Sequence, residues 1–292
     1  MTLLLGVLEQ GLIYAILALG VYITYKILDF PDLTVDSSFP LGAAVTAIMI
    51  SNGCHPLATL PAALAAGALA GVITGVIHVK FKVRDLLSGI IVMTALYSIN
   101  LRVAGKANVP IFNMPTLFKN DIVAALPKGL QAYVPLIVLA VLALVCKYVM
   151  DWFLSTKAGY LLRATGDNPN LVTSLAKDGG MVKIMGLAIA NGLVALAGGI
   201  MCQYQRYFDI SMGTGTMVIA LASVIIGTNM FKNTRFIRPT FAVIIGSILY
   251  KACVAAALSL GLAPTDMKLI TAVLFLIILV AGSGRKKVKR HA

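Results

Sequence analysis

The sequence predicts an all-α polytopic membrane protein with about 8–9 transmembrane helices. Of its 292 residues, 59% are hydrophobic and only 12% are charged, whereas a soluble domain carries about 25% charged residues. Apolar runs recur along almost the whole chain, so a single signal or anchor segment does not account for this composition. The main solvent of this chain is therefore lipid.

A helix needs roughly 20 apolar residues to cross a bilayer, and the length of each apolar run is judged against that number. The candidates are residues 3–28, 38–52, 57–79, 85–104, 131–150, 181–204, 214–230, 239–260 and 266–282. The second of these is short and the seventh is marginal. The first lacks the basic start and the cleavage site of a signal peptide, so we expect it to be retained. We expect one transmembrane domain over residues 1–284, followed by a basic tail at 285–292.

The distribution of basic residues predicts the orientation of these spans. If the tail 285–292 is cytoplasmic and the N-terminus lies outside, 17 of the 24 lysines and arginines fall on the cytoplasmic side. The opposite orientation would invert this bias and violate the positive-inside rule. The net charge of +13 is thus explained by cytoplasmic loops, and no nucleic-acid partner is expected.

Three aspartates interrupt the apolar pattern early in the chain. Asp29, Asp32 and Asp36 lie between two strongly apolar stretches, together with Pro31 and Pro40. A charged side chain at the bilayer centre costs roughly 2.5–3.5 kcal/mol on insertion scales, and prolines leave backbone carbonyls without a helical donor. Such backbone is tolerated at membrane depth only against protein or a water-filled cavity. The alternative is an ordinary loop at the membrane surface, and it applies above all to Asp29, which is the nearest of the three to the preceding helix end.

The span that follows is too short to cross the bilayer by itself. Residues 38–52 would reach about 22 Å at 1.5 Å per residue, against a hydrocarbon layer of roughly 30 Å. We therefore expect a discontinuous helix that begins inside the membrane. Asp36, Ser37 and Ser38 are expected to cap its first turn.

The same pattern occurs a second time. Residues 32–45 align without gaps to residues 209–222, pairing Asp32 with Asp209, Thr34 with Ser211 and Ser37 with Thr214. The predicted orientation makes the two copies enter the membrane from opposite sides, so they form an inverted internal repeat. In transporters, paired discontinuous helices of this kind mark a path near the midplane. For Asp32 and Asp36 we favour a structural role at the cavity wall over direct contact with a solute.

A polar segment at 155–180 is expected on the cytoplasmic side. Residues 159–165 are predicted to form a short helix that Gly166 ends, and a second short helix is predicted from Asn170 to Lys177. Leu161 and Leu162 are expected to be exposed beside Arg163, a combination suited to a partner's groove. The alternative is a helix lying on the lipid surface. Elsewhere, glycines spaced four residues apart at Gly67, Gly71 and Gly75 predict close helix packing.

Motifs for catalysis or metal binding are absent from the sequence. There is no P-loop, so an ATPase would have to be a separate subunit. There is also no nucleophile elbow and no HExxH pair. The four cysteines lack metal-ligand spacing, and the single glutamate, Glu9, is far along the chain from the later aspartates. A membrane-embedded enzyme is therefore disfavoured, and no metal site is expected.

Three stretches carry a resemblance to a known family. EQGLIYAILALGVYITYKILDFPDLTVDSSFPLGAAV (9–45) and AGYLLRATGDNPNLVTSLAKDGGMVKIMGLAIANGLVALAGGI (158–200) resemble the bacterial branched-chain amino acid and ribose type ABC permeases. DFPDLTVDSSFPLGAAV and IVMTALYSINLRVAGKANVPIF (91–112) are more similar to one subgroup, the permeases of tryptophan/tyrosine ABC importers. The resemblance covers nearly the whole chain.

The resemblance implies a type II ABC importer-like fold in a bacterial cell membrane. It further implies a homodimer, two ABC ATPase subunits beneath it, and an external substrate-binding lipoprotein. ATP would be used by the ATPase, so no cofactor is expected on this chain. We assign to the ATPase coupling segment Gly159, Leu162, Arg163, Ala164, Gly166 and Asn168. We assign to the substrate pathway Asp32, Thr34, Asp36, Ser37, Tyr97, Asn100, Asp209, Ser211 and Thr214.

The function expected from these observations is that of a permease subunit of an ABC importer. It would move a small solute, expected to be an amino acid and in particular an aromatic one, by alternating access. A sugar or nucleoside permease is the alternative within the class. An ion-coupled secondary transporter that uses the aspartates is a second alternative, but it leaves the segment 155–180 unexplained.

Overall fold

A computed structural model describes residues 2–120, 123, 125, 127–168, 178–232, 237–259 and 267–288. The long helices are α1 (Thr2–Val21), α3 (Thr59–Lys80), α4 (Asp85–Ala104), α7 (Val134–Leu154), α10 (Gly179–Gln205), α12 (Pro239–Ser259) and α13 (Met267–Val288). The shorter helices are α2 (Val35–Ser51), α6 (Lys128–Gln131), α8 (Lys157–Asp167) and α11 (Thr216–Met230). The chain is thus an all-α polytopic protein, as predicted.

The apolar segments predicted from the sequence recur as helices. Seven helical segments of the described chain are long and apolar enough to cross a membrane, and Val35–Ser51 and Leu269–Val280 are shorter apolar helices. The seventh predicted segment is extended by a 3-10 turn, η3 (Ile210–Gly213), so that Ile210–Met230 reaches 21 residues. The second remains short at 17 residues.

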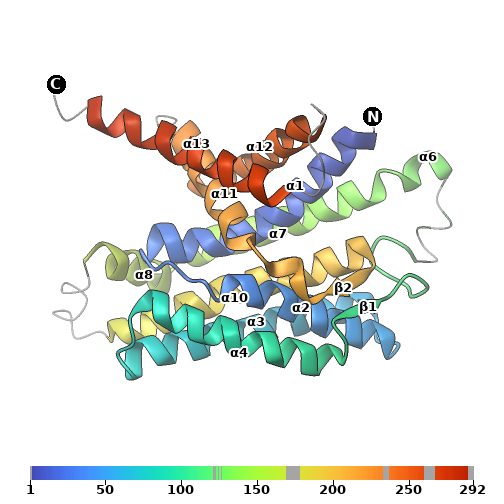
Figure 1. The fold of residues 1–292 in the computed structure, drawn as a ribbon, viewed down its shortest axis with the longest axis horizontal. Helices are drawn as coiled ribbons and strands as arrows, with labels where there is room; N and C mark the ends of the chain where they lie inside the picture. The colour runs from blue at the N-terminus through green and yellow to red at the C-terminus, as the bar shows by residue number, and fades with distance from the viewer. Residues whose placement is uncertain are drawn as a thin grey trace.

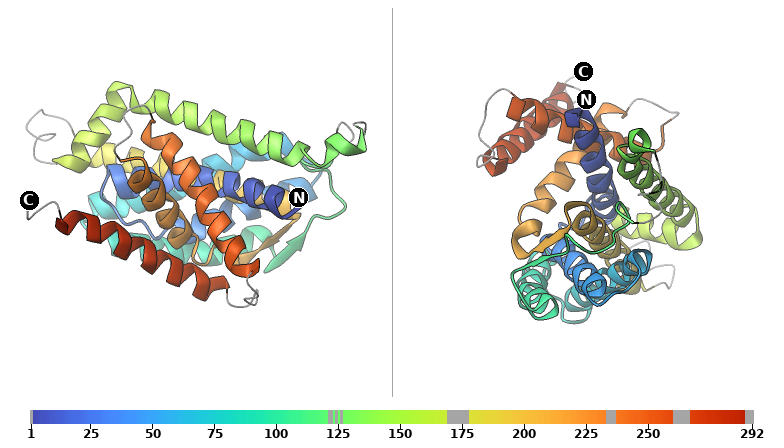
Figure 2. Two further views of the ribbon diagram at one scale, coloured as in Figure 1. Left: turned by 90° about the horizontal axis from the view of Figure 1, so that it is seen from above. Right: turned by 90° about the vertical axis from the view of Figure 1, so that its right-hand side faces the viewer.

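Helix α10 is the centre of the bundle. Of the 18 most apolar consecutive residues of α10, 78% are buried inside the protein. The corresponding share is 17% for the span Gly129–Leu154, which includes α7. Figure 1 shows α10 with α2, α3 and α4 in one layer, while α11, α12 and α13 lie on the opposite side of α1. Seen from above and from the side, α7 runs along the flank of the molecule (Figure 2).

Three glycines let α3 lie against the backbone of α10, as the sequence predicts. A methyl group on Gly67 would collide with the carbonyl of Asn191, and one on Gly71 with the carbonyl of Leu187. Gly75 meets the backbone and side chain of Ile184 in the same way. Small residues at this spacing allow the close approach on which helix packing in a membrane depends.

Two short strands form a sheet that the all-α prediction did not include. β1 (Asn108–Pro110) pairs antiparallel with β2 (Tyr207–Asp209), and Asn108 lies opposite Asp209. The sheet ties the end of α4 to the end of α10. It lies outside the helical spans, where backbone groups need no intrahelical partner.

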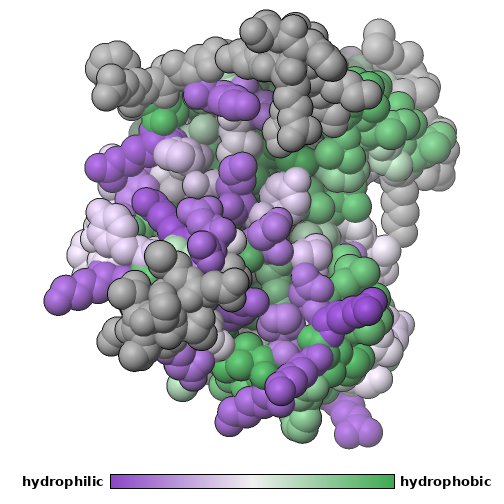
Figure 3. Space-filling view, turned by 90° about the vertical axis from the view of Figure 1, so that its left-hand side faces the viewer, coloured by the Kyte–Doolittle hydropathy of each residue, from purple (hydrophilic) through white to green (hydrophobic). Residues whose placement is uncertain are grey.

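At the opposite end of the molecule, α8 packs beneath the bundle. The first helix passes into a π-helix, η1 (Tyr22–Ile27), before irregular backbone leads on to α2. This end also carries the junction between α3 and α4 with the exposed basic residues Lys80, Lys82 and Arg84. Figure 3 shows hydrophilic side chains spread over this end of the molecule.

Candidate functional site

Helix α2 begins earlier than predicted, and its first turn is not capped in the expected way. It starts at Val35, and its N-cap residue Thr34 makes no side-chain cap hydrogen bond. The prediction that Asp36, Ser37 and Ser38 cap this turn was wrong. All three side chains instead bond to other helices, because the N-terminus of α2 is enclosed by protein.

A buried polar network surrounds the irregular backbone before α2. Asp32 is fully buried, and its carboxylate accepts the backbone N–H of Thr34 at 2.9 Å and the side-chain amide of Asn191 at 2.7 Å. The Asn191 amide oxygen accepts the Ser38 hydroxyl at 2.7 Å. The hydroxyls of Thr34 and Thr74 lie 2.9 Å apart. These bonds join the backbone at residues 28–34 to α2, α3 and α10.

Asp36 caps the N-terminus of α11 from a different helix. One carboxylate oxygen accepts the N–H of Met217 at 2.8 Å and the Thr216 hydroxyl at 3.1 Å, and the other accepts the N–H of Gly215 at 3.2 Å. Gly215, the N-cap of α11, has φ +85° and no side chain to cap with. Gly213 packs directly on the Asp36 carbonyl. The N-terminal turns of α2 and α11 therefore meet, with a negative charge at the positive end of the α11 dipole.

Ser37 and Asn100 attach α2 to α4. The Ser37 hydroxyl donates to the Met93 carbonyl at 2.8 Å, and the Asn100 side chain donates to the Ser37 carbonyl at 3.0 Å. The Asn100 Oδ1 atom has no hydrogen-bond partner within the described chain. Tyr97, on the same helix, is 50% exposed, and it takes no part in the hydrogen bonds between α4 and Ser37.

The second copy of the repeat contains the same local turn as the first. The Asp209 carboxylate accepts the N–H of Ser211 at 2.8 Å, two residues on, as Asp32 accepts that of Thr34. Ser211 also donates its hydroxyl, and Asn108 donates its amide at 3.2 Å. Thr214 ends the 3-10 turn, with its N–H bonded to the Ser211 carbonyl at 3.0 Å. This shared turn supports the proposed alignment.

The Asp209 carboxylate is held in its ionised form. Burial by itself would raise its pKa, but hydrogen bonds from the Ser211 side chain and backbone and from Asn108 lower the pKa below the usual value. A carboxylate offers about four acceptor positions. The bonds described here occupy three of them, so one acceptor position on Asp209 remains for a ligand.

Asp209 and Ser211 line a pocket of about 260 Å³. Its other lining residues are Tyr14, Phe39, Met201, Gln205, Tyr207 and Met212. The rings of Tyr14 and Phe39 stack with centroids 6.2 Å apart. Of the predicted pathway residues, only Asp209 and Ser211 line this pocket. The sequence did not point to its aromatic walls, because they come from helices distant along the chain.

Two buried ionisable residues of the apolar spans were not assigned to the site from the sequence. Lys251 of α12 is 8% exposed, and its ammonium lies 4.0 Å from the centre of the Tyr14 ring and 3.4 Å from the Gln10 side-chain oxygen. Glu9 is also buried and accepts the Tyr204 hydroxyl at 2.8 Å. A charge within an apolar span is the signal that could have identified them.

The coupling segment forms a longer helix than predicted. Helix α8 runs from Lys157 to Asp167, and the Thr156 hydroxyl caps its start by accepting the Gly159 N–H at 3.3 Å. Gly166 does not end the helix but packs against the carbonyl of Ile27 in η1. Asn168 follows the helix in extended conformation. The predicted second helix at 170–177 lies outside the described residues.

One surface expectation for α8 was wrong. Leu162 was expected to be exposed, but it is fully buried against Gly186 of α10. The helix is amphipathic, so Leu162 anchors it to the bundle. Arg163 is exposed on its outer side, and Ala164 is partly buried.

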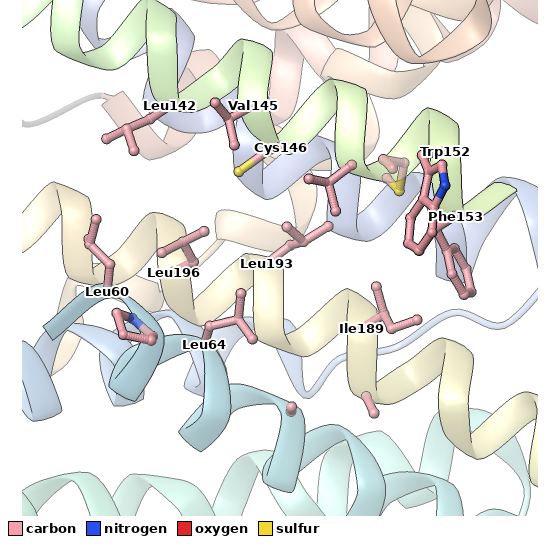
Figure 4. Close-up of a pocket in the computed structure, with 15 residues that line it drawn as sticks. Leu60, Leu64, Leu142, Val145, Cys146, Trp152, Phe153, Ile189, Leu193 and Leu196 are labelled. Carbon is pink, nitrogen blue, oxygen red and sulfur yellow. The ribbon is translucent and has the colours of Figure 1, made fainter. Parts of the chain in front are cut away.

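A second pocket is unsuited to a polar solute. It has a volume of about 560 Å³ and lies between α3, α7 and α10. Figure 4 shows its aliphatic and aromatic walls, with Trp152 and Phe153 near one end. It contains no residue predicted for the pathway. Nor do the described residues contain a cluster of three or more potential metal ligands.

The sequence of this chain is similar to a family of transport permeases. A family model described as "Branched-chain amino acid transport system / permease component" matches residues 3–281. The tyrosine transport system permease protein of Clostridioides difficile is 43% identical, over 98% of this chain and 94% of that protein. The ribose import permease protein RbsC of Haemophilus influenzae is 27% identical, over 77% of this chain and 68% of its own length.

The fold also resembles a solved structure. The complex "PsaBC from Streptococcus pneumoniae in complex with Fab" contains a chain that superposes with a TM-score of 0.52 at 12% identity. The match covers 93% of this chain and 89% of that one. At this identity the likeness concerns the fold alone.

Proposed function

This chain belongs to the branched-chain amino acid transport system permease family, and on that premise we propose that it is the transmembrane subunit of an ATP-driven importer. In this proposal it moves a small solute, an aromatic amino acid such as tyrosine or tryptophan, across a bacterial cell membrane. Separate ATPase subunits supply the energy, and the chain itself binds no cofactor. Transport proceeds by alternating access of the solute path to the two sides.

The observation that carries this proposal is a continuous line of contacts from α8 to the discontinuous helices. Gly166 of α8 lies against the carbonyl of Ile27 at the end of η1. The chain then runs directly to Asp32, which is bonded to α10, and to Asp36, which is bonded to α11. A force applied to α8 would therefore act on both half-helices. Interfaces with discrete packed arrangements convert small displacements into such switching.

The surface of the α8 end fits the proposed orientation and partners. Arg163 is exposed there, together with the basic junction at residues 80–84, as the positive-inside rule expects of a cytoplasmic face. We place the N-terminus outside and the C-terminus in the cytoplasm. The assembly would comprise two copies of this chain, two ATPase subunits docked at α8, and an external binding protein.

The relatives support an amino acid as the solute more than a sugar. The relative at 43% identity is a tyrosine transport system permease, whereas the ribose import permease is 27% identical and matches less of the chain. A sugar permease is the second candidate, favoured by that ribose relative.

Reversal of the charge on Arg163 tests the coupling role of α8. Arg163→Glu should abolish ATP-coupled uptake of tyrosine while insertion into the membrane stays normal, because the residue is exposed on the surface of α8. Uptake in cells, membrane abundance and co-purification of an ATPase are measured together. Arg163→Lys, which keeps the charge, should retain most of the uptake. Normal uptake by Arg163→Glu would rule out this role.

A further inference from the structure

The pocket beside β2 is lined by both polar and apolar side chains. Asp209, Ser211 and Gln205 provide polar groups, while Tyr14, Phe39, Met201 and Met212 provide aromatic and thioether surface. A cavity that combines apolar walls with a few placed polar groups is typical of a small-molecule site. Its volume of about 260 Å³ lies just below the range for drug-sized ligands, so it suits a smaller solute.

We propose that this pocket is a binding site on the transport path for the ammonium group and aromatic ring of an amino acid. Asp209 is the only charged residue that lines the pocket within the described chain. Its remaining acceptor position would receive the ammonium, while the ring packs against Tyr14 and Phe39. Aromatic pairs of this kind stabilise binding by more than their buried area accounts for. The sulfur atoms of Met201 and Met212 also make favourable contacts with aromatic rings.

The same groups disfavour a sugar. The Ser211 hydroxyl already donates to Asp209, so it offers no free donor to a ligand. A sugar packed against Phe39 and the two methionines would turn several of its hydroxyls toward apolar surface, and unpaired buried polar groups are strongly selected against. No cationic side chain lines the pocket within the described residues. Recognition therefore rests on the ammonium and not on the carboxylate.

This inference rests on the proposed transport function, and direct binding to the permease tests it independently of ATP-driven uptake. The wild-type chain in lipid nanodiscs is titrated with tyrosine, tyramine, 3-(4-hydroxyphenyl)propionate and ribose, and binding is followed by ligand-observed saturation-transfer NMR. Tyrosine and tyramine, which carry the ammonium, should bind. The deaminated acid and ribose should bind about tenfold more weakly or not at all, because they lack the charge-assisted hydrogen bond.

Two matched variants distinguish an effect on ligand binding at the pocket from a general effect of replacing an aspartate. Asp209→Asn keeps an oxygen for the Ser211 turn but loses the charge, so the affinity for tyrosine should fall about tenfold. Asp178→Asn is the control, since Asp178 makes a similar turn at the start of α10, accepting the N–H of Gly180 at 2.9 Å. Thermal unfolding establishes that both variants are folded.

Three outcomes would overturn the inference: absence of tyrosine binding to the wild type, equal binding of the deaminated acid or ribose, or unchanged affinity in Asp209→Asn. If ATP-driven tyrosine uptake is intact in any of these cases, the proposed function stands and only the pocket assignment falls. If tyrosine binds as expected but no ATPase drives uptake, the pocket assignment stands and the importer proposal falls.

Discussion

Asn191 is the residue at which the buried polar contacts converge. It donates to Asp32 at 2.7 Å and to the Leu187 carbonyl at 3.1 Å, and it accepts from Ser38 at 2.7 Å. Both amide hydrogens and the oxygen are thus in use. A satisfied buried network fixes one arrangement of its members, whereas a partly satisfied one is costly. Asn191 therefore determines how residues 28–34 sit on α10.

Substitution of Asn191 tests the energetic weight of this network. Asn191→Leu should destabilise the protein by about 2–4 kcal/mol, since Asp32 and Ser38 each lose a buried partner at about 1–3 kcal/mol. The midpoint of thermal unfolding in detergent measures the change. Asn52→Ala, at the exposed end of α2, is the control and should leave the midpoint unchanged. Equal midpoints for the two variants would show that the network contributes little.

For single residues, the sequence identified the polar groups of the site, but it did not identify their hydrogen-bond partners. Asp32 and Asp36 were recognised because charge and proline interrupt an apolar run, which is a local signal. Their partners Asn191 and Met217 are more than 150 residues away along the chain, and nothing in the local pattern indicates such pairings. Asn191 itself lies inside a continuous span, where a single amide is a weak signal.

Helices α2 and α11 depend on each other at their N-termini. Each lies in one copy of the repeat, and the Asp36 carboxylate supplies the cap that Gly215 lacks. Half-helix N-termini that meet inside the protein are a recurring arrangement in transporters. Because the contact consists of three hydrogen bonds to one side chain, it can break and re-form as the two helices move.

Removal of the Asp36 carboxylate tests this cap. Asp36→Ala should lower stability by about 1–2 kcal/mol, as loss of an N-cap does, and should also lower tyrosine uptake. Asp36→Asn should have an intermediate effect, because an amide oxygen still accepts while the charge facing the helix dipole is lost. Thermal unfolding and uptake are measured side by side.

Asp29 offers the matched control for this prediction. It is exposed, and its φ of +52° suits asparagine, so Asp29→Asn should behave as the wild type. An Asp36→Ala protein as stable and active as Asp29→Asn would mean that the α2–α11 contact is dispensable.

At the scale of the whole molecule, the apolar spans were predicted well because hydropathy is a local property. The seven long spans and two shorter helices match the segments read from composition. The β1–β2 sheet and the pocket beside it were missed, since both bring together residues about 100 or more positions apart. The burial of Leu162 was also missed, because its partners on α10 could not be known from the sequence of α8.

The molecule as a whole is best understood as two packed groups of helices around α1 and α10. α8 supports them at one end, and the β1–β2 sheet connects α4 to α10 at the other (Figure 1). The contacts from Gly166 to Ile27, Asp32 and Asp36 run between the α8 end and the half-helices. In our account the protein supplies the path and the moving parts, and a partner supplies the energy.

Tyrosine uptake into proteoliposomes tests that account most directly. The permease is reconstituted alone under a sodium or proton gradient, and in parallel with the ATPase subunit and the binding protein that we propose as its partners. Tyrosine is expected to accumulate only in the second preparation, and only when ATP is present. Gradient-driven accumulation by the permease alone would contradict it.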